Sequence, residues 1–175
     1  MSQRRVIGDK TYTLTTLCLL TRGDPTRQCL LGYKKSGFGK GKYSGFGGKV
    51  EAGENIAAAA ARELFEETGL RVAVTDLHSA GRLAFWFPYK PEWSQLVYIY
   101  TARNWLGEPV ESDEMIPSWF SVDQIPYQSM WQDGSHWLPP VLAGQHVQAD
   151  FVFCADNEAI ESVNLVLCGE NKHAI

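Results

Sequence analysis

Apolar residues occur along the chain in short runs, separated by glycine, proline or charged residues. Residues 11–20 (TYTLTTLCLL) are rich in Thr, Tyr and Leu, a composition typical of a strand. A turn at 21–27 contains Gly, Asp and Pro, and residues 28–34 are predicted to form the partner strand. Further strands are predicted at 72–77, 81–87, 95–102, 117–120, 149–154 and 162–168.

Two segments predict helices. Residues 54–68 contain five consecutive alanines, and Gly69 follows in the position of a C-terminal cap. A second helix is predicted at 133–143, where we expect Pro139 and Pro140 to lie near its start or to break it. Mixed strands with two helices in one compact chain predict a layered domain of the α/β or α+β class.

Composition and charge narrow the class of protein. The 175 residues correspond to one domain, which we expect over 1–175 with a core at about 11–168. An apolar content of 45% is sufficient for a globular core, and six tryptophans favour a ring-lined cleft because exposing them is costly. The formal net charge of −4 argues against a long nucleic acid as partner.

The four cysteines show neither CxxC spacing nor clustering with histidine, so we expect neither a disulfide framework nor a zinc site. Reduced thiols indicate a cytoplasmic protein. Asp9 and Lys10 interrupt any signal-peptide core at the N-terminus, and no apolar run has the length of a membrane span.

Three glutamates lie close together at the end of the first predicted helix. Glu63, Glu66 and Glu67 fall within roughly 100° of one another on one helix face. Their mutual repulsion opposes the helix by about 0.2–0.5 kcal/mol per pair, and the helix dipole disfavours anions there by about 0.3–1 kcal/mol. A bound hard cation such as Mg²⁺ would reverse both penalties. The residues alone leave a metal site and a solvated acidic face as equal alternatives.

Residues 48–70 follow a longer pattern: Gly, five residues, Glu, seven residues, then Arg-Glu-aliphatic-any-Glu-Glu-any-Gly-aliphatic. This pattern resembles the signature of the Nudix hydrolase family at every fixed position. The resemblance implies an α/β/α sandwich with a mixed central sheet, and Mg²⁺-dependent attack of water on a nucleoside diphosphate linked to another group. The matching positions are Gly48, Glu54, Arg62, Glu63, Leu64, Glu66, Glu67, Gly69 and Leu70.

The resemblance also implies residue roles. Arg62 and Glu54 would hold the loop and the helix in register, and Mn²⁺ is expected to substitute for Mg²⁺. Glu114, outside the signature, matches a family carboxylate that approaches the metal. The implied catalytic residues are Arg62, Glu63, Glu66, Glu67 and Glu114, and the implied metal ligands are these four glutamates with the backbone carbonyl of Gly48.

Outside the signature, residues 34–49, 109–115, 119–120 and 124–133 are similar to a MutT-like branch, the oxidised purine nucleoside triphosphatases of animals. This similarity implies hydrolysis of 8-oxo-dGTP and related nucleotides to the monophosphate and pyrophosphate, which removes mutagenic precursors from the nucleotide pool. Phe38 and Trp131 would pack against the base, and Lys34 would lie near the ribose or phosphates. The implied substrate-binding residues are Thr13, Lys34, Phe38, Ser44, Phe85, Phe87, Met115, Trp131 and Asp133.

Two departures from that branch concern the base. Ser44 stands where the animal enzymes have Asn, and Gly134 stands where they have a second Asp. Because hydrogen-bonding groups discriminate bases, these two departures bear on the selectivity for oxidised purines and not on catalysis. The alternatives are the same hydrolysis of an unmodified or methylated purine triphosphate or of an RNA 5′ end, and a nucleotide sensor without turnover. In each case we expect a small nucleotide as ligand and a monomer.

Overall fold

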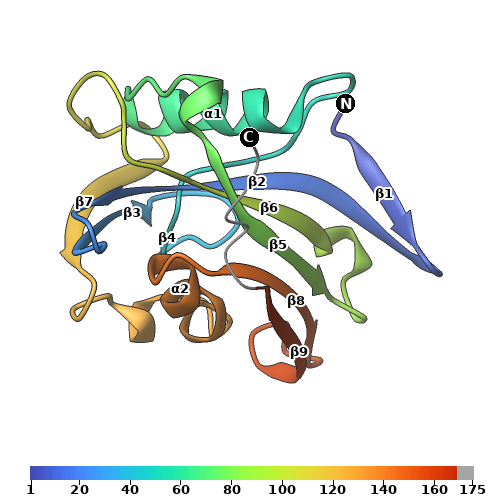
Figure 1. Cartoon of the computed structure of the whole chain (residues 1–175). Helices are drawn as coiled ribbons and strands as arrows, with labels where there is room; N and C mark the ends of the chain where they lie inside the picture. Colours follow the sequence, from blue (N-terminus) through green and yellow to red (C-terminus); the bar gives the residue numbers. More distant parts are fainter. Residues whose placement is uncertain (169–175) are drawn as a thin grey trace.

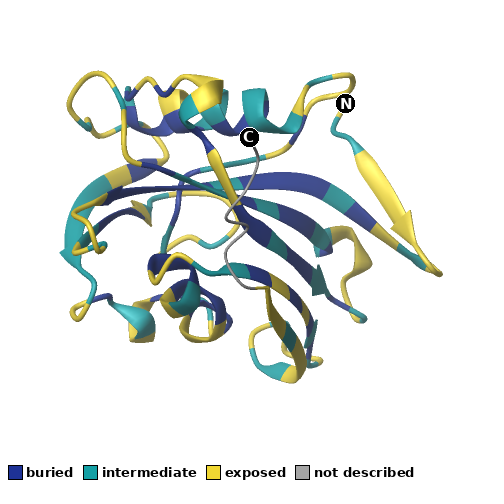
Figure 2. Cartoon of the chain, viewed as in Figure 1, coloured by how far each residue is buried: buried dark blue, intermediate teal, exposed yellow. Residues whose placement is uncertain are grey.

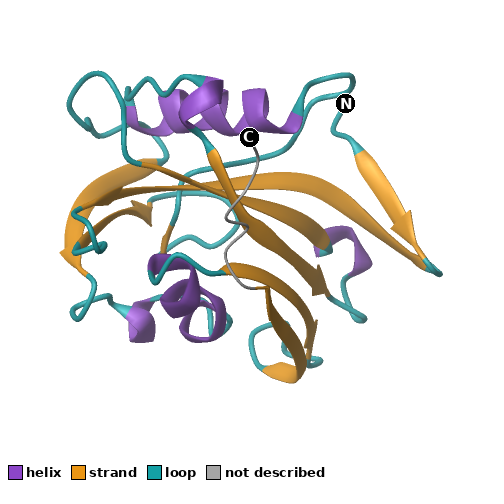
Figure 3. Ribbon diagram, viewed as in Figure 1, coloured by secondary structure: helices purple, strands orange, loops and turns teal. Residues whose placement is uncertain are grey.

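The computed structural model describes residues 1–168, which form a mixed sheet with a helix on each face (Figures 1 and 3). The strands are β1 (Arg4–Ile7), β2 (Lys10–Arg22), β3 (Gln28–Lys34), β4 (Tyr43–Ser44), β5 (His78–Trp86), β6 (Gln95–Ala102), β7 (Met115–Ser121), β8 (His146–Phe153) and β9 (Ile160–Cys168). The main strand order is β4-β3-β2-β6-β5-β8-β9, while β1 pairs with β2 and β7 with β3. The β2–β6 and β5–β8 pairs are parallel.

The helix α1 (Ile56–Thr68) covers one face of the sheet and α2 (Gly134–Leu142) covers the other (Figure 1). The expected α/β/α sandwich with a mixed sheet is therefore confirmed. Within residues 1–168 no helix combines the length and apolar character that crossing a membrane requires. Short 3₁₀ helices are present at Val74–Asp76, Pro91–Trp93 and Tyr127–Ser129.

Capping residues determine the bounds of α1. The Asn55 side chain accepts hydrogen bonds from the backbone N–H groups of Ala57 and Ala58, so the helix begins at Ile56, two residues later than predicted. Gly69 ends the helix at φ 76°, and its N–H donates to the carbonyl of Phe65. The expected glycine cap is thus confirmed, and it directs the chain away directly after the glutamates.

Side chains of β2 alternate between two cores. Leu17 and Leu19 pack with the residues under α2, whereas Cys18 and Leu20 pack with those under α1. Figure 2 shows buried residues along the central strands and exposed residues on β1. The strand β2 thus separates two environments, because successive residues of a strand point to opposite faces.

Two expectations about elements were wrong. Residues 72–77 form no strand but contain the 3₁₀ helix Val74–Asp76, because Val72 and Leu77 are both buried while the residues between them turn outward. Pro139 and Pro140 lie in the sixth and seventh positions of α2 and do not break it. The carbonyls that lose a donor belong to Ser135 and His136, which are exposed to water.

Candidate active site

A cavity of about 390 Å³ lies between the sheet and α2. Its floor is one face of three adjacent strands. Trp131 and the loop around Phe38, a half-exposed ring, line it from the side. This volume falls in the range typical of small-molecule sites. The floor residues are Thr15 and Leu17 of β2, Gln95 and Val97 of β6, and Leu83 and Phe85 of β5.

Aromatic rings form much of the cavity wall. Phe38 and Trp131 stack on each other, with ring centroids 5.2 Å apart and planes at 17°. Lys42 Nζ lies 5.0 Å from the ring centroid of Trp131. Deeper in the wall, Phe87 is only 2% exposed and stacks on Phe153 at 4.2 Å. Phe38 and Trp131 are therefore the accessible pair, and Phe87 belongs largely to the core.

Two of the polar side chains that line the cavity already have protein partners. Asp133 is buried and accepts a 2.7 Å hydrogen bond from Trp137 Nε1. Burial raises the pKa of Asp133 to about 6, although the Trp137 bond opposes this rise. Ser44 Oγ donates to the carbonyl of Gly45 at 2.8 Å, which uses the only hydroxyl proton of Ser44.

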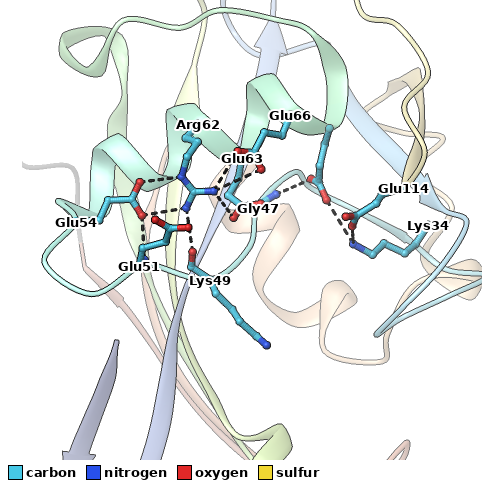
Figure 4. A network of polar contacts seen from close by, with 10 residues as sticks. Lys34, Gly47, Lys49, Glu51, Glu54, Arg62, Glu63, Glu66 and Glu114 are labelled. Carbon is cyan, nitrogen blue, oxygen red and sulfur yellow. Dashed lines mark hydrogen bonds and ion pairs between the residues drawn. The ribbon is translucent and has the colours of Figure 1, made fainter. Parts of the chain in front are cut away.

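On the α1 side of the sheet, Arg62 joins the helix to the preceding loop (Figure 4). Its Nε and Nη2 donate to the two oxygens of Glu54 at 2.8 and 2.9 Å, and Nη2 also donates to the carbonyl of Lys49 at 3.1 Å. Arg62 Nη1 donates to Glu63 Oε1 at 2.7 Å. The guanidinium lowers the pKa of Glu54, and this geometry agrees with the expected role of both residues as a clamp.

Glu67 is buried at the end of α1, with a 4% exposed fraction. One carboxylate oxygen accepts from the Gly47 N–H at 2.9 Å, and the other lies 3.4 Å from Lys34 Nζ. Lys34 Nζ also contacts Glu114 Oε2 at 3.0 Å. Burial raises the pKa of Glu67 to about 7, even though Lys34 and Gly47 both favour the charged form.

Glu63 packs directly on the backbone of Gly48. A Cβ at position 48 would clash with Glu63 Oε2, so a side chain there would displace the carboxylate. Burial raises the pKa of Glu63, and the hydrogen bond from Arg62 opposes that rise. Gly47 and Gly48 also line the cavity, so this loop connects the glutamates to it.

Residues 11–141 match the NUDIX domain family model. The chain belongs to the Nudix family. An oxidized purine nucleoside triphosphate hydrolase of Danio rerio is 46% identical over 151 residues, covering 86% of this chain and 93% of that protein. An oxidized purine nucleoside triphosphate hydrolase of Mus musculus is 43% identical over 155 residues, covering 89% of this chain and 95% of that protein. The crystal structure of a MutT protein from Bacillus halodurans superimposes with a TM-score of 0.72 at 25% identity. The match covers 87% of this chain and 97% of that chain.

The Nudix fold brings most of the predicted substrate-binding residues to one cavity. Thr13 is not among its lining residues, whereas Thr15, two residues further along the same face of β2, is. Sequence reasoning overlooked Gln95 and Trp137, although Gln95 begins a correctly predicted strand. The predicted residues that line the cavity are Lys34, Phe38, Ser44, Gly48, Phe85, Phe87, Glu114, Met115, Trp131 and Asp133.

Nudix proteins typically depend on a divalent metal. The side chains here supply hard carboxylate oxygens, which Mg²⁺ prefers, and the glycine at 48 leaves room for the Glu63 carboxylate against the backbone. Among residues 1–168, no three His, Cys, Asp or Glu side chains converge as ligands; basic side chains contact these carboxylates instead. The donor chemistry therefore fits such an ion, and the side chains of Glu66 and Glu114 are 55% and 60% exposed.

Proposed function

We propose that this Nudix protein hydrolyses oxidised purine nucleoside triphosphates, such as 8-oxo-dGTP, to the monophosphate and pyrophosphate. The observation that carries the proposal is the position of the aromatic cavity, whose glycine loop contacts the carboxylates of α1. Two relatives that bear this activity in their names share 43% and 46% of their residues with the chain over nearly its whole length. Removal of damaged precursors from the nucleotide pool would follow from the reaction.

The cavity is suited to a purine base. Phe38 and Trp131 present nearly parallel rings at its accessible side, and stacking a base on an aromatic ring contributes about 1–3 kcal/mol. Ser44 and Asp133 place polar atoms near that base, while Phe85 and Met115 add apolar surface. Thr15 replaces Thr13 in this assignment because it lines the cavity.

The phosphates would lie toward the glycine loop and α1. The ion, Mg²⁺ or Mn²⁺, would be held by Glu63, Glu66, Glu67 and Glu114 with the carbonyl of Gly48. When bound, it neutralises phosphate charge and makes water a stronger nucleophile.

The protein's own groups have separate tasks in this reaction. The Glu67 carboxylate, buried beside the glycine loop, is suited to accept a proton from the attacking water. Gly47 N–H holds one of its oxygens in place, and Arg62 orients Glu63. Lys34, released from Glu67 and Glu114, would pair with the phosphates.

The alternatives differ in their ligand or in turnover. An unmodified or methylated purine triphosphate would enter the same cavity, whereas a long RNA finds little support in a net charge of −4. A sensor without turnover has no need for all the signature glutamates, which this chain retains. We further propose a monomer in the cytoplasm, where the free thiols of Cys18, Cys29, Cys154 and Cys168 stay reduced.

The test is release of pyrophosphate from a panel of triphosphates by the full chain with Mg²⁺, and with EDTA as control. We expect turnover of 8-oxo-dGTP, which Glu63→Gln removes. Glu161→Gln, an exposed glutamate on β9, is the matched control and should turn over like the wild type. Absence of pyrophosphate from every triphosphate would contradict the proposal.

A further inference from the structure

The floor of the cavity contains a polar pair in otherwise apolar surroundings. Thr15 and Gln95 lie on the adjacent parallel strands β2 and β6, which run side by side with β5 in the middle of the sheet (Figure 1). In the register of these strands, Thr15 is opposite Val97, and Gln95 is opposite Phe85. The neighbouring floor residues Leu17, Leu83, Val97 and Phe85 are all apolar.

The two polar side chains contact each other. Thr15 Oγ1 donates to Gln95 Oε1 at 3.4 Å. Among the side-chain hydrogen bonds within residues 1–168, none has Gln95 Nε2 as its donor. Thr15 is 6% exposed, so its position is determined by packing, and its contact with Oε1 leaves the amide nitrogen of Gln95 to face the cavity.

Two of the other polar side chains of the cavity are not free donors. Asp133 is an acceptor already bonded to Trp137, and the Ser44 hydroxyl donates to Gly45. Within the described residues 1–168, the amide nitrogen of Gln95 is thus a donor in a largely apolar floor without a hydrogen-bond acceptor from the protein. Leaving such a donor unpaired when a ligand excludes water costs free energy, so a ligand that supplies an acceptor is preferred.

We propose that Gln95 is a specificity-determining residue that donates a hydrogen bond to an exocyclic carbonyl of the purine, and that Thr15 positions it. This inference rests on the proposed function, since it concerns the base of the same nucleotide. Guanine and 8-oxoguanine carry exocyclic carbonyls that accept such a bond, whereas adenine has an amino donor in place of the C6 carbonyl and accepts only through its ring nitrogens. The cavity therefore favours oxopurines over adenine, through a residue outside the segments that suggested a base site.

The test uses nucleoside monophosphates, which bind without hydrolysis. Affinities for dGMP, 8-oxo-dGMP and dAMP are measured by tryptophan fluorescence with the wild type, Gln95→Met and Thr15→Val. Methionine keeps the length of the side chain and removes the amide. The control Leu96→Met changes the next residue of β6, which is buried on the opposite face of the sheet.

We expect Gln95→Met to weaken binding of at least one carbonyl-bearing nucleotide by roughly 3- to 15-fold and to leave dAMP unchanged or tighter. Thr15→Val should reduce the preference partly, and Leu96→Met should retain it. Equal loss for all three nucleotides, or no loss, overturns the proposal, as does a wild type without preference for carbonyl-bearing bases. Because binding needs no turnover, this result is independent of whether the protein hydrolyses triphosphates.

Discussion

The Glu67 carboxylate accepts a hydrogen bond from the backbone N–H of Gly47 at 2.9 Å, which ties the end of α1 to the loop that lines the cavity. A buried carboxylate at a helix C-terminus is unfavourable on two counts, desolvation and the helix dipole. The Gly47 N–H and Lys34 compensate only in part, because the pKa of Glu67 is still raised to about 7. Because this arrangement is energetically costly, substitution of Glu67 is an informative test of the site.

Glu67→Gln should abolish turnover and stabilise the metal-free fold at high pH. Since burial raises the pKa of Glu67 from the usual 4.5 to about 7, the folded protein binds more protons than the unfolded chain between these values. The stability contributed by this group therefore falls as pH rises through that window, by on the order of 3 kcal/mol in total. A glutamine at position 67 does not ionise, so the stability of the variant does not fall for this reason.

Thermal unfolding in EDTA at pH 5 and pH 8 measures the effect of Glu67→Gln. The variant should approach the wild type at the lower pH and exceed it at the higher pH. Turnover with Mg²⁺ should fall at least about 100-fold, as expected for removal of a general base. Turnover within a few-fold of the wild type would refute the assignment of Glu67.

Trp131→Ala should act on nucleotide binding. Loss of one stacking face predicts a KM for the triphosphate raised roughly 5- to 150-fold, with kcat at saturation nearly unchanged. Trp105→Ala is the matched control, because Trp105 stacks on Trp119 away from the cavity. Should KM stay constant, Trp131 has no contact with the base.

The double substitution Ser44→Asn and Gly134→Asp should narrow the range of bases that the protein accepts. The wild type presents few fixed hydrogen-bonding groups at these positions, so we expect activity on 8-oxo-dGTP together with broader tolerance of dGTP than the animal enzymes show. A Cβ at Gly134 would lie 3.3 Å from Met130 Cε, the end of a flexible side chain, so the helix accepts the substitution.

The measurement for this pair is the ratio of kcat/KM for 8-oxo-dGTP over dGTP, with Gly134→Ala as control for the added Cβ. The ratio should rise in the double variant and stay at the wild-type value in the control. A wild type that already prefers the oxidised base by orders of magnitude would show that its selectivity arises from other residues.

Gly48→Ala should impair catalysis with little loss of stability. The new Cβ would clash with Glu63 Oε2, and the flexible carboxylate can move away. Gly47→Ala is a contrasting variant, since its Cβ would meet the backbone carbonyl oxygen of Thr16 and the strand cannot yield easily. We expect a normal melting temperature with reduced turnover for Gly48→Ala and a strongly lowered melting temperature for Gly47→Ala. Full activity of Gly48→Ala would contradict the placement of Glu63.

Strong local signals explain which parts of the fold were predictable. The strand at 95–102 was predicted at its observed bounds, and α1 was displaced at its start by two residues because Asn55 caps it. The strand β1 was overlooked, since all four of its residues are exposed and carry no alternation of burial. The segment 72–77 was misassigned because the apolar residues Val72 and Leu77, which are buried on either side of a turn, resemble a strand in sequence.

The candidate site was predictable where a local motif specified it. The signature placed Arg62 and Glu54 correctly side by side, whereas the contact of Lys34 with Glu67 joins residues 33 positions apart and needs the folded sheet. The choice of Thr15 over Thr13 depends on the register between β2 and β6, which no local pattern records. Gln95 escaped notice for the same reason, because its neighbours in the cavity come from other strands.

The alternation along β2 has an evolutionary consequence. Thr15 and Leu17 line the cavity, while Cys18 and Leu20 support α1 from the other face. Such a strand carries two interleaved sets of positions, and a substitution in one set leaves the packing of the other largely intact. Relatives can therefore acquire a new base preference through a few changes on the face that α2 covers, without rebuilding the carboxylates that α1 presents.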